Sequence, residues 1–325
     1  MPSFQVLRAT NIPYYSTCSE GVDGRHLYLF LPLEGDQFLP DLSRMKLGAV
    51  LLACNENSHY LSYWPIVKDT WLKLVQVPVH LVFVGRQLPE QLKGDRYVSH
   101  FQWPLVPEGY QTISKTWPTA TVAQTIRLLY PALMEVDGAV LIGDIDCAPL
   151  NPEYFHTEVA KTKEDQFVSL RGLLEQHKEV AMMYVAAHPK TWGEMFGIKS
   201  MIDIIGKLNE WSRDFPADGK HGSLGWTTDQ RELYKVVKQW QRDKPDRIRV
   251  VDWSWDIPRL CRSMPAEWIN GLSEPLKSRL AYKHYIDFHM PSLNQYPKQI
   301  LEILNFALQA HHQMKAQSTA QGSSL

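Results

Sequence analysis

A regular alternation of apolar runs and amphipathic stretches begins at residue 47. The continuous apolar run Leu47–Ala53 ends at polar Asn-Glu-Asn and is typical of a strand buried on both faces of a parallel sheet. Residues 58–75 have the pattern of a helix, and Val79–Val84 is a second apolar run that Gly85 ends. These segments predict a strand–helix–strand unit with a right-handed crossover.

The alternation continues as far as residue 143. The pattern predicts a short strand over 97–103, a helix over 119–134, and a buried strand over 138–143 that runs directly into Asp144-Ile145-Asp146. This order is typical of an open α/β sheet, in which ligands bind at the carboxyl ends of the strands. Asp144 and Asp146 follow such an end.

The second half of the chain mixes strands and helices, and no clear linker divides it. The pattern predicts strands over 166–170, 182–187, 247–251 and 283–289, and helices over 190–196, 199–211, 228–240 and 296–315. We therefore expect one composite α/β domain, with a first half over 47–150 and a second half over 151–312. Residues 1–46 are irregular and are expected to pack on the core, and residues 313–325 are predicted to form a disordered tail.

Composition narrows the class of protein. Apolar residues make up 44% of the chain and charged residues 21%, as in ordinary globular proteins. The 34 lysines and arginines almost balance 35 acids, so no basic field indicates a nucleic-acid partner. No stretch approaches the roughly 18 apolar residues that span a bilayer, and no secretory signal is evident. We therefore expect a cytoplasmic protein without a transmembrane segment.

The cysteines support the same expectation. Cys18, Cys54, Cys147 and Cys261 are widely separated and form no CxxC pair. This spacing argues against a structural zinc site and against a disulfide framework. A reducing compartment fits it best.

Asp144 and Asp146 are the residues whose spacing points to chemistry. In a strand, two carboxylates one residue apart would point to opposite faces, whereas at a strand-to-loop turn they can converge. Like charges this close repel each other unless a cation or a proton lies between them. Oxygen ligands favour Mg²⁺ or Mn²⁺, completed by phosphate oxygens and water. The motif predicts a site for a metal ion and a diphosphate; the alternative is one aspartate that caps a turn beside a solvated one.

The segment DGAVLIGDIDCAPLNPEYF resembles the Asp-x-Asp segment of GT-A glycosyltransferases. The preceding TATVAQTIRLLYPALMEVDG is similar to the helix before that motif, and VAMMYVAAHPKTWGEMF to the strand-turn-helix that lines the donor sugar and acceptor side. The resemblance extends from about Gly48 to about His289. It implies a Rossmann-like mixed sheet flanked by helices, and transfer of a sugar from a UDP- or GDP-linked nucleotide sugar to a carbohydrate or glycoconjugate acceptor.

The resemblance implies a ligand set for Mn²⁺ or Mg²⁺. Asp146 would ligate the metal directly, and Asp144 would contact the ribose or ligate the metal through water. A third ligand would be a histidine near the C-terminus, for which YKHYIDFHMP offers His289 first and His284 second. Either histidine could instead be a packed or surface residue.

The resemblance also implies a nucleotide site. Arg127 matches the basic residue that reaches the nucleotide diphosphate or the ribose. Asn55 and Glu56 follow the first strand, in the loop where these enzymes bind the nucleobase.

Asp229 and Gln230 are the candidate catalytic residues. The segment GWTTDQREL has an N-cap threonine and an acid in the first helical turn, where the helix dipole stabilises a carboxylate. The resemblance implies more, because the family has its catalytic acid at the start of this helix. We favour inversion with Asp229 as general base. Gln230 keeps open a retaining reaction in which the glutamine lies near the reactive face of the sugar.

Three tryptophans are candidates for stacking on a sugar. An apolar sugar face packs well against an indole ring, which makes Trp226, Trp253 and Trp255 the candidates. Core packing is the alternative for each of them, and we favour it for any single one.

Three other functions share parts of the pattern. A magnesium-dependent phosphatase of the haloacid-dehalogenase type also follows a strand with Asp-x-Asp, but Gly-Thr is expected where this chain has Cys147-Ala148. A sugar nucleotidyltransferase would need a glycine-rich basic loop where ACNENSH stands. A carbohydrate-binding protein without turnover is the non-enzyme alternative.

Overall fold

A computed structural model describes residues 44–103, 117–214, 222, 225–251 and 258–322. All of these residues belong to one compact unit, Ser43–Leu325. Trp253, Trp255 and nearly all of the predicted irregular segment 1–46 lie outside the described residues.

Within the described ranges, seven strands form a mixed sheet in the order β10-β6-β9-β4-β1-β2-β3. Strand β9 is antiparallel to both of its neighbours, and the other pairs in the sheet are parallel. The strands are β1 (Leu47–Asn55), β2 (Val79–Gly85), β3 (Val98–Gln102), β4 (Ala139–Ile142), β6 (Phe167–Ser169), β9 (Val185–Ala187) and β10 (Ile248–Val250). The predicted α/β class, with a mixed sheet flanked by helices, is confirmed.

The sheet is buried on both faces, as its apolar strands predict. Along β1, Leu52 belongs to one hydrophobic core and Leu51 to the other, because successive side chains point to opposite faces. All four residues of β4 are buried. Parallel strands covered by helices on both sides need continuous apolar sequence, and this chain supplies it.

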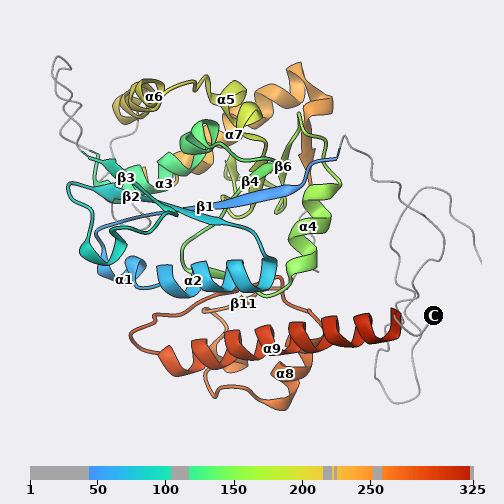
Figure 1. Cartoon of the computed structure of the whole chain (residues 1–325). Coiled ribbons are helices and arrows are strands. Elements are labelled where there is room, and N and C mark those ends of the chain that lie inside the picture. The colour runs from blue at the N-terminus through green and yellow to red at the C-terminus, as the bar shows by residue number, and fades with distance from the viewer. Residues whose placement is uncertain (1–43, 104–116, 215–221, 223–224, 252–257, 323–325) are drawn as a thin grey trace, which may run out of the picture. The chain divides into compact units, whose positions relative to one another are not determined.

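Helices pack in two groups, one in each of the two hydrophobic cores on the sides of the sheet (Figure 1). One group comprises α3 (Thr119–Leu129), α5 (Pro189–Phe196), α6 (Met201–Asp214) and α7 (Thr228–Asp243). The other comprises α2 (Trp64–Thr70), α4 (Pro152–Ala160), α8 (Glu274–Ala281) and α9 (Pro297–Gly322). The first group includes α3 and α7, which carry Arg127 and Asp229.

Prolines interrupt two of the predicted helices. The helix expected over 58–75 is divided into α1 (Ser58–Leu61), α2 and a π-helix over Trp71–Val75. A proline in the first turn of α2 starts a new helix there, since proline lacks the amide that would continue the preceding one. The helix expected over 119–134 ends as α3 at Leu129 and continues as a 3₁₀ turn over Tyr130–Leu133, which also has a proline in its first turn.

The C-terminal helix is longer than the pattern predicts. Helix α9 runs to Gly322, beyond the predicted end at residue 315, so most of the segment expected as a tail (313–325) is helical. Its apolar side chains Ile300, Ile303 and Leu304 pack in the core. Among the described helices, none is long and apolar enough to span a bilayer.

A second, three-stranded sheet adjoins the carboxyl end of β4. Its order is β11 (Leu260–Cys261), β12 (Asp287–His289) and β5 (Cys147–Pro149). Strands β12 and β5 are antiparallel with His289 opposite Cys147, and β11 is parallel to β12 with Cys261 opposite His289. This pairing places residues 260–261 and 287–289 beside the Asp-x-Asp turn.

Candidate functional site

The Asp-x-Asp segment forms the turn between β4 and β5. The amide of Cys147 donates a hydrogen bond to the carbonyl oxygen of Asp144 at 3.1 Å, which closes the turn. Before it, the amide of Gly143 donates to the Leu51 carbonyl at 3.1 Å. A Cβ at Gly143 would lie 3.1 Å from Cδ2 of Leu52, so glycine allows this close approach to β1. Both aspartates therefore lie at the carboxyl end of the parallel strands.

Asp144 lies beside Arg127, a buried arginine on α3. Arg127 forms an ion pair with the Asp144 carboxylate and donates to the Gly143 carbonyl at 3.0 Å. Its second guanidinium nitrogen is 3.3 Å from Oδ2 of Asp229, in the first turn of α7. Three of the predicted site residues thus meet in one charge network, although they come from three separate segments.

Burial governs the charges in this network. Burial raises the pKa of Asp229 to about 6, while the Arg127 charge and the Gln230 amide oppose the rise. For Arg127, burial opposes the charge, but the nearby carboxylates of Asp144 and Asp229 raise its pKa above the usual value. The network therefore holds a permanent cation and a carboxyl group that titrates close to neutral pH.

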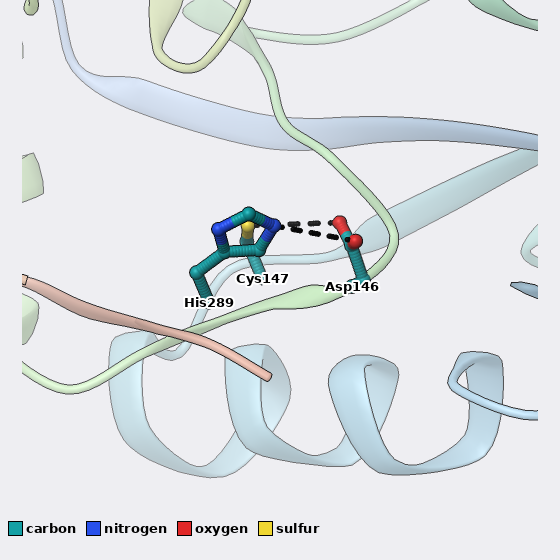
Figure 2. Close-up of side chains that lie close together, drawn as sticks. All are labelled: Asp146, Cys147 and His289. Carbon is teal, nitrogen blue, oxygen red and sulfur yellow. Dashed lines mark hydrogen bonds and ion pairs between the residues drawn. The ribbon is translucent and has the colours of Figure 1, made fainter. Parts of the chain in front are cut away.

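Asp146 lies among a different set of partners. Its Oδ2 accepts a hydrogen bond from Arg262 at 2.9 Å and is 3.4 Å from Nε2 of His289. The Sγ of Cys147 is 3.7 Å from the other carboxylate oxygen. Figure 2 shows Asp146, Cys147 and His289 close together at the junction of the two sheets.

Asp146 and His289 stabilise each other's charge. Burial opposes ionisation of Asp146, but the hydrogen bond and the charge of His289, together with the Arg262 charge, lower the pKa of this carboxyl group. Burial also opposes the charge of His289, yet the Asp146 carboxylate raises the pKa of the imidazole. Without a metal ion, Asp146 is an ion-paired carboxylate.

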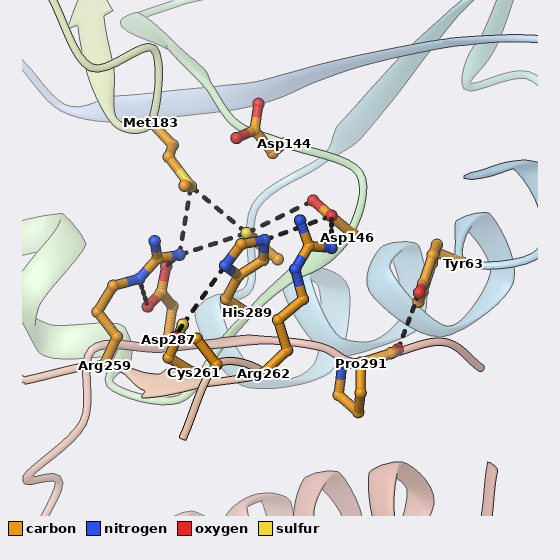
Figure 3. Close-up of polar contacts among 12 residues, drawn as sticks. Tyr63, Asp144, Asp146, Met183, Arg259, Cys261, Arg262, Asp287, His289 and Pro291 are labelled. Atoms are coloured by element: carbon orange, nitrogen blue, oxygen red, sulfur yellow. Dashed lines mark hydrogen bonds and ion pairs between the residues drawn. The ribbon is translucent and has the colours of Figure 1, made fainter. Parts of the chain in front are cut away.

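A second buried carboxylate lies on the same strand as His289, two residues before it. Asp287 on β12 is fully buried and accepts hydrogen bonds from Arg259 at 2.7 and 2.6 Å and from the Tyr184 hydroxyl at 2.8 Å. The Arg259 guanidinium is also 3.3 Å from Sγ of Cys147. In Figure 3 the guanidinium groups of Arg259 and Arg262 lie on either side of the His289 ring.

The residues predicted for the nucleobase lie at the same edge of the main sheet. Asn55 ends β1, and its side-chain amide donates to Oγ1 of Thr119, the first residue of α3, at 3.0 Å. Glu56 follows and is exposed, with its carboxylate beside Gly85 at the end of β2. Asn55 thus connects the first strand to the helix that carries Arg127.

The remaining candidates are not part of the Asp146 cluster, and Trp253 and Trp255 lie outside the residues that the structure describes. His284 follows α8, and its ring packs against Tyr285 with the ring centroids 5.0 Å apart. Trp226 is half-buried in the turn that leads into α7. Gln230 lies in the first turn of α7, and its backbone amide donates to Oδ1 of Asp229 at 2.9 Å.

The donor atoms around Asp146 fit a divalent cation. One ligand atom from each of Asp146, Cys147 and His289 lies within 4.8 Å of the others, and Asp146 and Cys147 are buried. A carboxylate and an imidazole are accepted by Mn²⁺, Zn²⁺ and related ions. Asp146 and His289 were predicted from the sequence. Cys147, Arg259 and Arg262 were missed, because strand pairing across more than a hundred residues brings them together.

No protein-family model and no curated protein matches the chain. Among solved structures, the chain is similar to galactosyltransferase LgtC in complex with donor and acceptor sugar analogs, at 14% identity over 75% of this chain and 84% of that one, with a TM-score of 0.36. An active-site mutant of LgtC matches at 13% identity over 75% and 85% of the two chains, with a TM-score of 0.38. The bifunctional glycosyltransferase WbbM in its apo form matches at 9% identity over 80% of this chain and 46% of that one, with a TM-score of 0.32. All three of these proteins are glycosyltransferases by name.

Proposed function

We propose that this chain transfers a hexosyl or pentosyl group from a UDP- or GDP-linked sugar to a hydroxyl of a carbohydrate or glycoconjugate acceptor. One observation carries the proposal: Asp146 and His289, far apart in sequence, meet at 3.4 Å at the carboxyl end of β4. The Arg127–Asp144–Asp229 network lies beside them, on the other side of the same turn. Glycosyl transfer needs positive charge beside the leaving diphosphate and a base for the acceptor hydroxyl, and these groups would supply both.

The donor would lie along the carboxyl edge of the main sheet. Asn55 and Glu56 would hold the nucleobase, with the Arg127–Asp144 pair at the ribose. The diphosphate would lie next to Asp146 and His289, where Arg262 adds a positive charge that is 38% exposed and so accessible to a ligand. A bound Mn²⁺ or Mg²⁺ would supply further positive charge to the leaving diphosphate.

Asp229 would act as the general base of an inverting reaction. The acceptor oxygen would attack the anomeric carbon, the bond from that carbon to the diphosphate would break, and Asp229 would take the hydroxyl proton. A pKa of about 6 makes this carboxyl group ionised at neutral pH and yet basic enough to accept a proton. The neighbouring Arg127 would hold the carboxylate in place, since it is 3.3 Å away.

A retaining reaction is the second candidate, and one observation favours it. Asp229 is only 2% exposed, whereas Gln230 is half-buried and so presents more of its side chain to a substrate. Gln230 would then lie near the reactive face of the sugar, with Asp229 orienting its backbone. Determining the anomeric configuration of the product by NMR separates the two reactions.

A thermal-shift screen with nucleotide sugars, with and without Mn²⁺, tests the proposal. We expect one UDP- or GDP-sugar to raise the melting temperature in the presence of metal, and release of the nucleotide diphosphate to be lost in Asp146→Ala. Metal-dependent hydrolysis of simple phosphate esters would instead support the phosphatase, and binding of glycans without nucleotide release would support a carbohydrate-binding protein. No shift with any nucleotide sugar would refute donor binding.

A further inference from the structure

Cys147 faces the metal-binding position, although the sequence indicates no role for it. It begins β5 directly after Asp146 and is 1% exposed. Its sulfur lies 3.7 Å from Oδ1 of Asp146, while Nε2 of His289 lies 3.4 Å from Oδ2. The carboxylate therefore has an imidazole nitrogen near one oxygen and a sulfur near the other.

These separations correspond to the edges of a metal coordination sphere. Donors that lie about 2.0–2.3 Å from a tetrahedral cation are separated from one another by roughly 3.3–3.7 Å. The sulfur and the imidazole nitrogen lie at such distances from different oxygens of the Asp146 carboxylate, and one donor atom from each of the three residues lies within 4.8 Å of the others. Small side-chain adjustments would bring all three donors to one ion.

The backbone and the neighbouring side chains hold the sulfur and the imidazole in this arrangement. Cys147 and His289 are opposite each other in the β5–β12 pair, so their distance is determined by strand register. On the far side of the ring, Sγ of Cys261 lies 3.7 Å from Nδ1 of His289, which leaves Nε2 directed toward Asp146. Such contacts to the second nitrogen orient histidine ligands in metal sites. Burial raises the pKa of the Cys147 thiol well above its usual value, and the Arg259 guanidinium, 3.3 Å from the sulfur, opposes this rise.

We propose that Cys147 is a third protein ligand of this site, and that the site prefers a borderline cation such as Zn²⁺ to Mn²⁺ or Mg²⁺. The inference deepens the proposed function and rests on it, because the same ion would face the donor diphosphate. Binding replaces the thiol proton with the metal ion and releases the proton to solvent. Sulfur ligands favour zinc-like ions over magnesium and manganese. Three protein ligands leave the fourth tetrahedral position for a phosphate oxygen or water.

Titration of the whole chain with Co²⁺ tests this ligand without any assay of transfer. A thiolate bound to Co²⁺ gives a charge-transfer absorption band in the near ultraviolet, and we expect that band to saturate at one ion per chain. One equivalent of Zn²⁺ should remove it. In Cys147→Ser the band should vanish and Zn²⁺ should bind at least about tenfold more weakly, while Mn²⁺ affinity changes by less than about threefold. Cys261→Ser is the matched control and should keep the band, since Cys261 faces Nδ1.

Two results would overturn the proposal: Co²⁺ binding without the band, or a band that survives in Cys147→Ser. Because Cys147 is buried, circular dichroism must show that its serine variant is folded; independently, His289→Gln should weaken Co²⁺ binding in a chain that retains the sulfur. The glycosyl-transfer proposal fails separately. A sulfur band without binding of any nucleotide sugar would refute transfer alone, and metal-dependent transfer without a sulfur band would refute the thiolate ligand alone.

Discussion

The two aspartates of the Asp-x-Asp turn are one residue apart but have different neighbours. Asp144 pairs with Arg127, which also contacts Asp229, and the Arg127 and Asp229 side chains are 8% and 3% exposed. Asp146 faces His289, which is 18% exposed, and Arg262, which is 38% exposed. The Asp144 carboxylate, itself 28% exposed, pairs with a buried arginine, whereas the Asp146 carboxylate is 9% exposed and pairs with partners that are more open to solvent.

This difference shows how the chain separates two like charges without a shared ion. The turn directs Asp144 toward α3 and α7, and Asp146 toward β11 and β12. Each carboxylate therefore has an arginine of its own, Arg127 or Arg262. The buried Arg127–Asp229 contact keeps its geometry, because breaking it would leave buried charges without compensation. Arg262 is more exposed, so it can move away from Asp146 when a ligand binds there.

The largest effect is expected from Asp146. Replacing it with Asn removes the charged ligand, and we expect transfer to fall by roughly 10³-fold or more, with metal affinity at least about 100-fold weaker. Asp144→Asn is the matched control, because it changes the same atoms one residue away. It should weaken metal binding by less than about tenfold. Isothermal titration with Mn²⁺ and Zn²⁺ measures both, and equal losses in the two variants would show that both aspartates ligate the ion.

A smaller loss of transfer is expected from Asp229. Asp229→Asn removes the proposed base but keeps the shape of the side chain, so transfer should fall by about 10²–10⁴-fold while donor affinity stays within about threefold. In the native chain Asp229 must be ionised to accept a proton, and its pKa is about 6. The rate should therefore rise with pH up to about 6 and then level off. Wild-type-like turnover in Asp229→Asn, combined with a large loss in Gln230→Ala and a retained anomeric configuration, would support the retaining reaction.

The buried network should also dominate stability. Arg127→Gln leaves Asp144 and Asp229 without their shared cation, and we expect a loss of about 3–5 kcal/mol in the free energy of unfolding. Arg262→Gln breaks a pair that is more exposed, so its effect on stability should be about 0–1 kcal/mol. Urea denaturation at neutral pH measures both. A loss from Arg262→Gln as large as that from Arg127→Gln would contradict the contrast between the two networks.

Local sequence predicts the main sheet well because burial and periodicity act over short distances. The apolar runs at Leu47–Ala53 and Val79–Val84 lie within β1 and β2, since a strand buried on both faces needs continuous apolar sequence. The single helix expected over 58–75 was wrong, because the proline at its middle starts a new helix.

The site is less accessible to sequence reasoning, because its parts meet through long-range pairing. Asp144 and Asp146 have a local signal in their spacing, and their roles together with those of Arg127 and His289 came from a resemblance. Cys147 has no such signal, since its importance depends on the register that sets it opposite His289. The roles assigned to these residues stay predictions until a ligand is bound.

The smallest effect is expected where a charge pair lies on the surface. Asp69 and Lys73 are four residues apart, their charged atoms are 2.7 Å from each other, and the side chains are 52% and 58% exposed. Water solvates both charges whether or not they pair, so Lys73→Met should change the free energy of unfolding by no more than about 0.5 kcal/mol. It should leave metal affinity unchanged, because the charge of Lys73 is exposed to water, where it pairs with Asp69. The distance in this pair is shorter than the 3.3 Å between Arg127 and Asp229, yet its predicted contribution is several times smaller. Measuring both variants in one urea series tests whether burial, rather than separation, determines what each pair contributes; a loss above about 2 kcal/mol from Lys73→Met would reverse that ranking.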